Sequence, residues 1–384
     1  MNPDRDKEDR TDGIEILRHL IAINTVNPPG KEKAAAEYLA ELLAPYGFCC
    51  EVQDLGDDRA NLIAWIGKEE GPELIFNGHL DVVPAIGRWE TDPFEAVFQE
   101  GRIYGRGTAD MKGGIAAMCE AAIGIARRGG PGKGRLQLVF VADEECANLG
   151  TLGYLKNYKP GTFAVIGEPT GLKVAIAHRG VSRDYIDLLG KTRHAALPRE
   201  GEDAMIMAAR TILAVDKISK NLESRSHEVL PPPSIAVTMA QGYEKDNIVP
   251  GKVRLLLDFR ILPGMSHEEV CGILRSGLEK AGIEGYEIVP HFYMPGGEIP
   301  SGDAFVGLCM EVRNQVLGEK QDKPCAFDAS CEQCFLAERG IRTVICGPGD
   351  LAQAHTVGEF VPEEDIRQAA RLYEAIAERI LGKI

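Results

Sequence analysis

Two things that the sequence lacks narrow the classes of protein to consider. It has no apolar stretch of about 18 residues, the length that a membrane-spanning helix needs, so we expect no membrane protein. It also lacks an excess of basic residues, with 43 Lys and Arg against 58 Asp and Glu. The formal net charge of −15 argues against nucleic-acid binding, which needs a basic face. The segment Met1 to Arg10 is charged and has no apolar core, so we expect no secretory signal.

Cysteine is present, but not in the pattern of a disulfide scaffold or of a structural zinc site. The ten cysteines are spread over 384 residues, and several lie inside apolar runs (Cys119, Cys309, Cys346), which is typical of buried free thiols. Cys331 and Cys334 form one C-x-x-C pair, whereas structural zinc usually needs a second pair. These patterns favour a reduced, cytoplasmic protein.

The order of the expected elements indicates one domain inserted into another. Strands alternate with helical stretches up to about residue 172 and again after residue 291, which is typical of a doubly wound sheet. We therefore predict a mixed-sheet α/β catalytic domain formed by residues 1–172 and 292–384. A smaller α+β domain of ferredoxin-like type, residues 173–291, interrupts it. In this insert, Val174 to Ala177 and Tyr185 to Leu189 are expected to be paired strands.

Five short groups of metal-ligand residues together indicate a metal site. Four of them directly follow apolar, β-rich runs. Ligands gather beyond the carboxyl ends of strands in an open α/β sheet, so we expect these side chains to converge at one sheet edge. Two imidazoles and several carboxylates favour a centre with two metal ions. The groups are His79-Leu80-Asp81, Asp110 in a glycine-rich segment, Asp143-Glu144-Glu145, Glu168 and His355.

Positions within these groups indicate a division of roles. Asp110 could bridge two ions from its glycine-rich loop. Glu144 and Glu145 are neighbours that point in different directions, so one can bind metal while the other accepts a proton from the bound water. Asp81 is placed to accept the second N–H of His79 and fix its tautomer. Each group alone is more often a turn or a solvated acidic segment, and only their order and repeated position support a site.

The same segments resemble a family of di-zinc amidohydrolases and peptidases. The family includes acetylornithine deacetylase, succinyl-diaminopimelate desuccinylase, aminoacylases and glutamate carboxypeptidase. The resemblance runs from about Asp12 to the C-terminus and implies a homodimer in which the inserted domain is a lid that pairs the subunits. It rests on Gly78 to Pro84, Gly105 to Gly114, Asp143 to Glu145, Gly167 to Thr170, Asn247 to Pro250, Asp258 to Arg260, Gly347 to Gly349 and Ala354-His355.

The resemblance also implies how the metal ligands and the base are assigned. The two zinc ions would be held by His79 and Glu168 on one, by Glu145 and His355 on the other, and by Asp110 on both. Glu144 would be the general base, which takes a proton from the bridging water and gives it to the leaving amine. Cobalt or manganese could replace zinc. The peptide bond after the bridging aspartate is often cis in this family, which here is Asp110–Met111.

Further residues are implied to touch the substrate. His194, within Gly190 to Ala196, would stabilise the oxyanion in the partner's active site, although a surface histidine in a turn is the alternative. Arginine suits carboxylate recognition because of its parallel N–H groups. For Arg260, a structural ion pair with Asp258 is the alternative. The implied substrate-binding residues are Arg179, Asn247, Arg260, Gly347 and Gly349.

The sequence departs from the family pattern near the expected pocket. A Thr-Asp-Ala-type segment usually precedes the last catalytic strand, but Ala326 to Ser330 carries Phe327 in place of the hydroxyl. Glutamate at position 168 is more usual in deacylases and carboxypeptidases than in aminopeptidases. We therefore predict a zinc-dependent hydrolase that cleaves the amide bond of a small N-acyl amino acid, such as acetylornithine or succinyl-diaminopimelate. A dipeptidase or carboxypeptidase with the same site is the first alternative, and a catalytically silent binding protein is a remote one.

Overall fold

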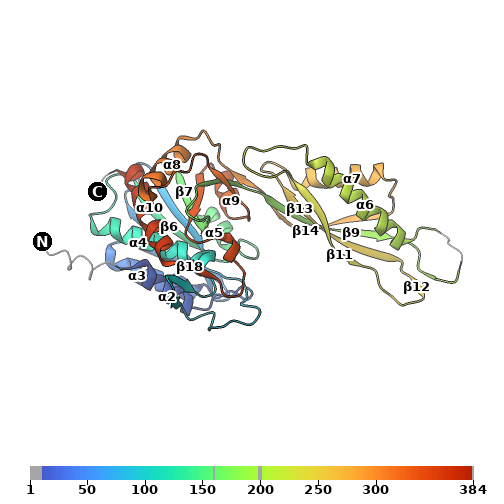
Figure 1. Cartoon of the computed structure of the whole chain (residues 1–384), viewed down its shortest axis with the longest axis horizontal. Coiled ribbons are helices and arrows are strands. Elements are labelled where there is room, and N and C mark those ends of the chain that lie inside the picture. The colour runs from blue at the N-terminus through green and yellow to red at the C-terminus, as the bar shows by residue number, and fades with distance from the viewer. Residues whose placement is uncertain (1–10, 159–160, 198–200, 383–384) are drawn as a thin grey trace. The chain divides into compact units, whose positions relative to one another are not determined.

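The computed structural model describes residues 11–158, 161–197 and 201–382 (Figure 1). The expectation for Met1 to Arg10 lies outside these residues. The chain forms two compact units: Met1–Ile176, Glu298–Phe327 and Cys331–Ile384 make the first, and Ala177–Gly297 with Asp328–Ser330 make the second. None of the helices in the described part of the chain combines the length and apolarity that a membrane span requires.

The first unit contains a mixed sheet with the strand order β1-β2-β6-β3-β7-β17-β8-β15, and β16 pairs with β8. Neighbours among β6, β3, β7 and β17 are parallel, whereas β1, β2 and β6 pair antiparallel. Every residue of β3 is buried, as expected for a parallel strand covered on both faces. The strands are β1 (Cys49–Gly56), β2 (Arg59–Gly67), β3 (Glu73–His79), β6 (Arg135–Val141), β7 (Phe163–Pro169), β8 (Ala175–His178), β15 (Gly297–Glu298), β16 (Cys325–Phe327) and β17 (Arg342–Gly347).

Helices cover this sheet, and α4 and α10 pack on each other and on β3 and β6. In α10, apolar residues recur every three or four positions, which gives the helix one buried stripe. Close approach of α4 to β7 requires Gly114, since a Cβ there would lie 2.2 Å from the Gly167 carbonyl oxygen. The helices are α2 (Gly13–Ala22), α3 (Lys33–Leu43), α4 (Gly113–Arg127), α5 (Leu149–Asn157), α8 (Ala304–Leu317), α9 (Gln333–Glu338) and α10 (Glu363–Leu381).

Short elements beside this sheet hold the loops that matter for the site. The strands β4 (Val97–Gln99), β5 (Arg102–Tyr104) and β18 (Phe360–Pro362) form a small sheet of their own. Two short helical turns, η2 (Thr108–Lys112) and η3 (Leu351–Gln353), precede α4 and β18 respectively.

The second unit is an antiparallel sheet of order β11-β13-β9-β14 with two helices. Burial alternates strictly along β13, the pattern of a strand with one buried face. The chain order β-α-β-β-α-β with this strand order is ferredoxin-like. Its elements are β9 (Gly180–Leu189), α6 (Ala204–Leu222), β11 (Ser234–Gln241), β13 (Lys252–Ile261), α7 (His267–Lys280) and β14 (Tyr286–Met294), and β10 (Arg193–His194) pairs with β12 (Ile248–Val249).

The predicted mixed α/β sheet and the separate small antiparallel sheet are both confirmed. One strand pairing was wrong. The strand expected at Val174 to Ala177 is β8, and it pairs with β17 of the main sheet, while β9 pairs with β13 and β14. Both segments are apolar and short, so their sequences alone do not distinguish these partners. The unit boundaries accordingly fall at 176/177 and 297/298, compared with the predicted 172/173 and 291/292.

Candidate metal centre

Six side chains of the first unit converge beyond the carboxyl ends of the parallel strands. His79 is the last residue of β3, Glu168 lies at the end of β7, and Glu144 and Glu145 follow β6. Asp110 comes from η2, and His355 follows η3. Strands that run parallel deliver their carboxyl ends to one edge, which explains why residues so far apart in sequence meet.

The carboxylate of Asp110 lies between two pairs of candidate ligands. Its Oδ1 is 3.0 Å from His79 Nε2, and that nitrogen is 3.6 Å from Glu168 Oε1. Its Oδ2 is 3.3 Å from His355 Nε2, which is 3.0 Å from Glu145 Oε1. The two oxygens of one carboxylate thus face two separate groups of donors. This is the arrangement of a bridging ligand.

Glu359 holds the loop that carries Asp110, a role that no sequence motif predicts. The buried Glu359 carboxylate accepts hydrogen bonds from the backbone N–H groups of Gly107, Ala109 and Asp110. It also accepts a bond from the buried Arg106 guanidinium, at 2.6 Å. Four donors on one carboxylate fix the backbone on the N-terminal side of Asp110. The Asp110–Met111 peptide bond is cis, as expected from the resemblance.

Asp81 organises a different segment from the one expected. His79 Nδ1 is 2.9 Å from the main-chain oxygen of Asp81 and 3.5 Å from its carboxylate. The carboxylate instead accepts the backbone N–H groups of Glu144 and Glu145, both at 3.1 Å, and the side-chain amide of Asn27. The tautomer of His79 is therefore set by a backbone carbonyl. Asp81 positions the turn that presents Glu144 and Glu145.

The electrostatics of the cluster are those of a site with surplus negative charge. Burial raises the pKa of Glu144, and of Glu168, well above the ordinary range. Hydrogen bonds to Asp110 and Glu145 raise the pKa of His355 to about 10. For His79, burial opposes the charged form, but the nearby carboxylates of Asp110 and Asp81 still raise its pKa. Carboxylates that resist ionisation beside imidazoles that favour protonation indicate a place where cations are stabilised.

A further buried carboxylate, Glu332, belongs to this environment and was missed in the sequence. Glu332 precedes α9, is 0% exposed, and accepts no hydrogen bond from another described residue. Burial, with smaller contributions from the negative charges of Asp81 and Asp110, raises its pKa to about 7. Its sequence neighbours Cys331 and Gln333 gave no metal-type pattern. Phe327, the substituted position, is 3% exposed.

The residues implied to contact substrate are divided between the two units. His194, Asn247, Arg179 and Arg260 belong to the second unit. There the Asn247 amide nitrogen lies 3.1 Å from His194 Nε2. The Arg260 guanidinium bonds to Asp258 at 2.7 Å, so the ion pair considered as the alternative is present. Burial lowers the pKa of Arg179, and the positive charge of Arg260 lowers it further.

Gly347 and Gly349 lie in the first unit, at and just after the end of β17. The backbone N–H of Gly347 donates to Thr170 Oγ1, and that of Gly349 donates to Asp365. A Cβ on Gly347 would lie 2.1 Å from the Gly167 carbonyl oxygen, and Gly349 has φ +84°. Gly347 allows close packing against the strand end that carries Glu168, and the N–H groups of both glycines are engaged within the protein.

The donor set fits two divalent cations. Imidazole nitrogens and carboxylate oxygens are ligands of catalytic zinc, and cobalt or manganese accept the same donors. Two groups of three candidate ligands share Asp110: His79, Asp110 and Glu168, and Asp110, Glu145 and His355. Within each group, the ligand atoms lie within 4.8 Å of one another. Glu144 lies within the same distance of His79 and Glu145. A carboxylate beside two ligand sets can act as the general base in metal-assisted hydrolysis of an amide.

The comparisons with known sequences agree on one family. A family model described as peptidase family M20/M25/M40 matches residues 75–379. Acetylornithine deacetylase of Proteus mirabilis (strain HI4320) is 31% identical over 367 residues, covering 91% of each chain. A protein of the same name from Vibrio cholerae serotype O1 (strain M66-2) is 29% identical over 377 residues, covering 94% of this chain and 96% of that one.

Solved structures share the fold at lower identity. An M20 family metallo-carboxypeptidase from Sulfolobus solfataricus has a TM-score of 0.76 at 20% identity, covering 95% of this chain and 98% of that one. A dinuclear metal-binding peptidase of the M20 family from Bacillus subtilis has a TM-score of 0.73 at 18% identity, covering 97% and 98%.

Proposed function

The chain belongs to peptidase family M20/M25/M40 and is a metallohydrolase, and from this premise we propose that it cleaves the amide bond of a small N-acyl amino acid. The observation that carries the proposal is the position of Asp110 between two ligand groups, with Glu144 beside them. The named relatives at about 30% identity support the N-acyl class, with acetylornithine as the first substrate to test. We propose zinc as the native metal and a cytoplasmic location, which the ten free cysteines support.

The proposed chemistry divides between the metal ions and the protein. His79 and Glu168 would hold one ion, Glu145 and His355 the other, and Asp110 both. When bound, the ions polarise the scissile carbonyl and acidify the attacking water. Glu144 accepts the proton of that water while the water oxygen bonds to the carbonyl carbon. Glu144 then passes the proton to the amine nitrogen as the C–N bond breaks, so one carboxylate serves both steps.

The arginines proposed to bind the substrate belong to the second unit. Arg179 and Arg260 lie close enough for the charge of one to lower the pKa of the other, in addition to the effect of burial. Two neighbouring guanidinium groups favour a bound anion, and a substrate carboxylate is such an anion. Asp258 neutralises part of this charge, because it pairs with Arg260 and with Arg183.

We also propose that the second unit is a lid that forms the homodimer and that His194 acts in the partner's site. The edge strand β11 and the helix α6 carry exposed apolar side chains, which include Met239, Ile212 and Leu213. The backbone N–H of Ala196 donates to His194 Nδ1, and the Asn247 amide nitrogen lies 3.1 Å from Nε2, so the ring is held in a defined orientation. An imidazole N–H is a donor that can stabilise an oxyanion.

The dimer proposal can be tested by mixing two inactive variants. His194→Ala and Glu144→Gln subunits, each inactive alone, should regain activity when they exchange into heterodimers, because one composite site then has both residues. Exchange is verified with differently tagged subunits. If exchanged heterodimers stay inactive, His194 does not act across the interface.

Amine release from a matched panel tests the proposed function. The zinc-loaded enzyme is offered N-acetyl amino acids, N-succinyl amino acids and dipeptides with the same amino-acid portion, and Glu144→Gln serves as the blank. We expect cleavage of one acyl series, with N-acetylornithine among the substrates. Cleavage of dipeptides alone would assign the same site to a peptidase and overturn the deacylase proposal.

A further inference from the structure

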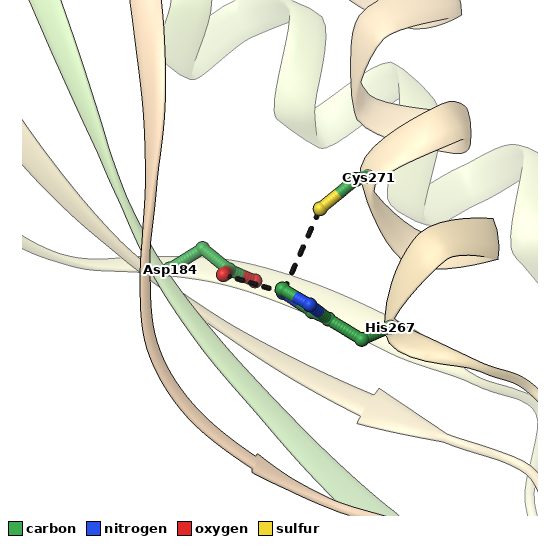
Figure 2. A group of neighbouring side chains, drawn as sticks. All are labelled: Asp184, His267 and Cys271. Carbon is green, nitrogen blue, oxygen red and sulfur yellow. Dashed lines mark hydrogen bonds and ion pairs between the residues drawn. The ribbon is translucent and has the colours of Figure 1, made fainter.

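A second cluster of metal-type side chains lies in the second unit and shares no residue with the centre described above. It consists of Asp184 on β9 and of His267 and Cys271 on α7 (Figure 2). One ligand atom from each of the three residues lies within 4.8 Å of the other two. Asp184 and Cys271 are buried, while the His267 side chain is 30% exposed.

Regular secondary structure places these residues. Ser266 caps α7 by accepting the backbone N–H of Glu269, so the helix begins at His267. His267 and Cys271 are four residues apart and therefore lie on one face, one turn from each other. Asp184 lies on β9, the strand between β13 and β14, where it is opposite Leu257 and Pro290.

The contacts of the imidazole distinguish a metal site from a proton relay. Asp184 Oδ1 is 2.8 Å from His267 Nε2, and Cys271 Sγ is 3.6 Å from the same nitrogen. In a Cys-His-Asp nucleophile system, the acid and the thiol would use different ring nitrogens. One N–H cannot serve both partners well. Side chains that converge on a single nitrogen are arranged as ligands around a common point.

The distances also fit coordination. Zinc ligands at about 2.0–2.3 Å in tetrahedral geometry lie about 3.3–3.6 Å from one another. The Nε2 to Sγ distance of 3.6 Å matches this range. The Nε2 to Oδ1 distance of 2.8 Å is shorter, and a small rotation of the Asp184 side chain would open it. Ser182 Oγ donates to Asp184 Oδ2 at 2.8 Å, which leaves Oδ1 directed at His267.

We propose that Asp184, His267 and Cys271 bind one divalent cation of the zinc class, with solvent as the fourth ligand at the exposed side of His267. The thiolate and carboxylate would supply two negative charges, and the mixed sulfur, nitrogen and oxygen set favours zinc or cobalt over calcium or magnesium. The ion ties the first turn of α7 to the central part of the lid sheet. The site is structural, and the proposal does not depend on the substrate of the enzyme.

Cobalt spectroscopy tests the proposal, because this is the only cluster of metal-type side chains among the described residues that includes a cysteine. Metal-free enzyme is titrated with Co²⁺, and the near-ultraviolet band of thiolate-to-cobalt charge transfer is followed. We expect the band in the wild type and its loss in Cys271→Ser. Cys146→Ser is the matched control, since Cys146 is exposed and adjacent to Glu145 of the other centre. A wild type without the band, or a band lost in Cys146→Ser and kept in Cys271→Ser, overturns the proposal.

Metal stoichiometry provides a second readout. Zinc per chain is measured after equilibrium dialysis of folded wild type, Cys271→Ser and His267→Gln, with circular dichroism confirming the fold of each. We expect each variant to bind one ion fewer than the wild type, and His267→Gln covers the case in which Cys271→Ser does not fold. Equal stoichiometry in the wild type and the folded variants would mean that the cluster holds no ion.

Discussion

The two clusters of metal-type side chains are built on different kinds of support. The centre in the first unit takes most of its side chains from segments that follow strand ends, and buried carboxylates fix these segments by accepting backbone N–H groups. The cluster in the second unit lies on one helical turn and one strand, which need no such support. Loops can orient a base and leave a ligand position open, whereas regular elements hold a fixed ligand set. The difference is the one expected between a catalytic and a structural metal site.

The largest effect is expected from loss of the proposed base, which belongs to the first centre and not to the second cluster. Glu144→Gln keeps the size of the side chain but cannot accept a proton, so we expect kcat to fall by about 10²- to 10⁴-fold. Metal content should be unchanged in both clusters, since neither ligand set includes Glu144. Steady-state kinetics and metal analysis measure the two effects, with Glu70→Gln, an exposed glutamate, as the control. Wild-type turnover in Glu144→Gln would remove Glu144 from the mechanism.

Weakening the support of the first centre should affect that centre alone. The Asp81 carboxylate accepts the backbone N–H groups of Glu144 and Glu145. In Asp81→Asn an amide nitrogen replaces one carboxylate oxygen, so one of these N–H groups loses its acceptor. Loss of such an outer contact costs about 10- to 100-fold in metal affinity. Competition with a chelator measures it, and the lid cluster should keep its ion. An unchanged affinity at the first centre would mean that the turn holds its position without Asp81.

A smaller effect is expected from an ion pair that stabilises only the lid. Hydrogen bonds from Arg254, with added bonds from Lys252, lower the pKa of Asp187 to about 2. A lowered carboxyl pKa stabilises the fold above the unfolded pKa of about 3.9, and this contribution is lost as the pH falls toward 2. Because Arg254 and Lys252 are partly exposed, we expect Asp187→Asn to cost about 1 kcal/mol at pH 7.

Urea unfolding at pH 7 and at pH 3 measures this contribution. The difference in unfolding free energy between the wild type and Asp187→Asn should shrink at the lower pH. Asp216→Asn is the control, since Asp216 pairs with Lys220 on the surface and such an exposed pair contributes little to stability. A difference for Asp187→Asn that stays constant with pH would show that its effect is not electrostatic.

The sequence predicts the first cluster better than the second for a physical reason. Polar residues that directly follow buried strands must meet at a sheet edge, so His79 and Glu168 could be brought together from their local context alone. The helical spacing of His267 and Cys271 is equally visible, but Asp184 lies 83 positions away along the chain. No local sequence pattern predicts that Asp184, a buried residue of a strand, faces the helix that carries His267.

The supporting residues were missed for the same reason. Glu359 and Glu332 are single acids without a pattern, and their roles arise from burial beside the Asp110 loop and the metal ligands. Asp81 was identified, but its carboxylate binds backbone groups of the neighbouring turn, which depends on how the strands are placed side by side. The predicted pairing of β8 was wrong because pairing partners depend on tertiary packing, which strand propensity does not encode.

Crystals of the zinc-loaded enzyme, measured at the zinc absorption edge, test the central claim most directly. We expect two anomalous peaks about 3.5–4 Å apart on either side of the Asp110 carboxylate. One should be bonded to His79 and Glu168, and the other to Glu145 and His355, with a third peak between Asp184, His267 and Cys271. A single peak at Asp110, or two peaks that do not share this carboxylate, would contradict the assignment of Asp110 as the bridge between two metal ions.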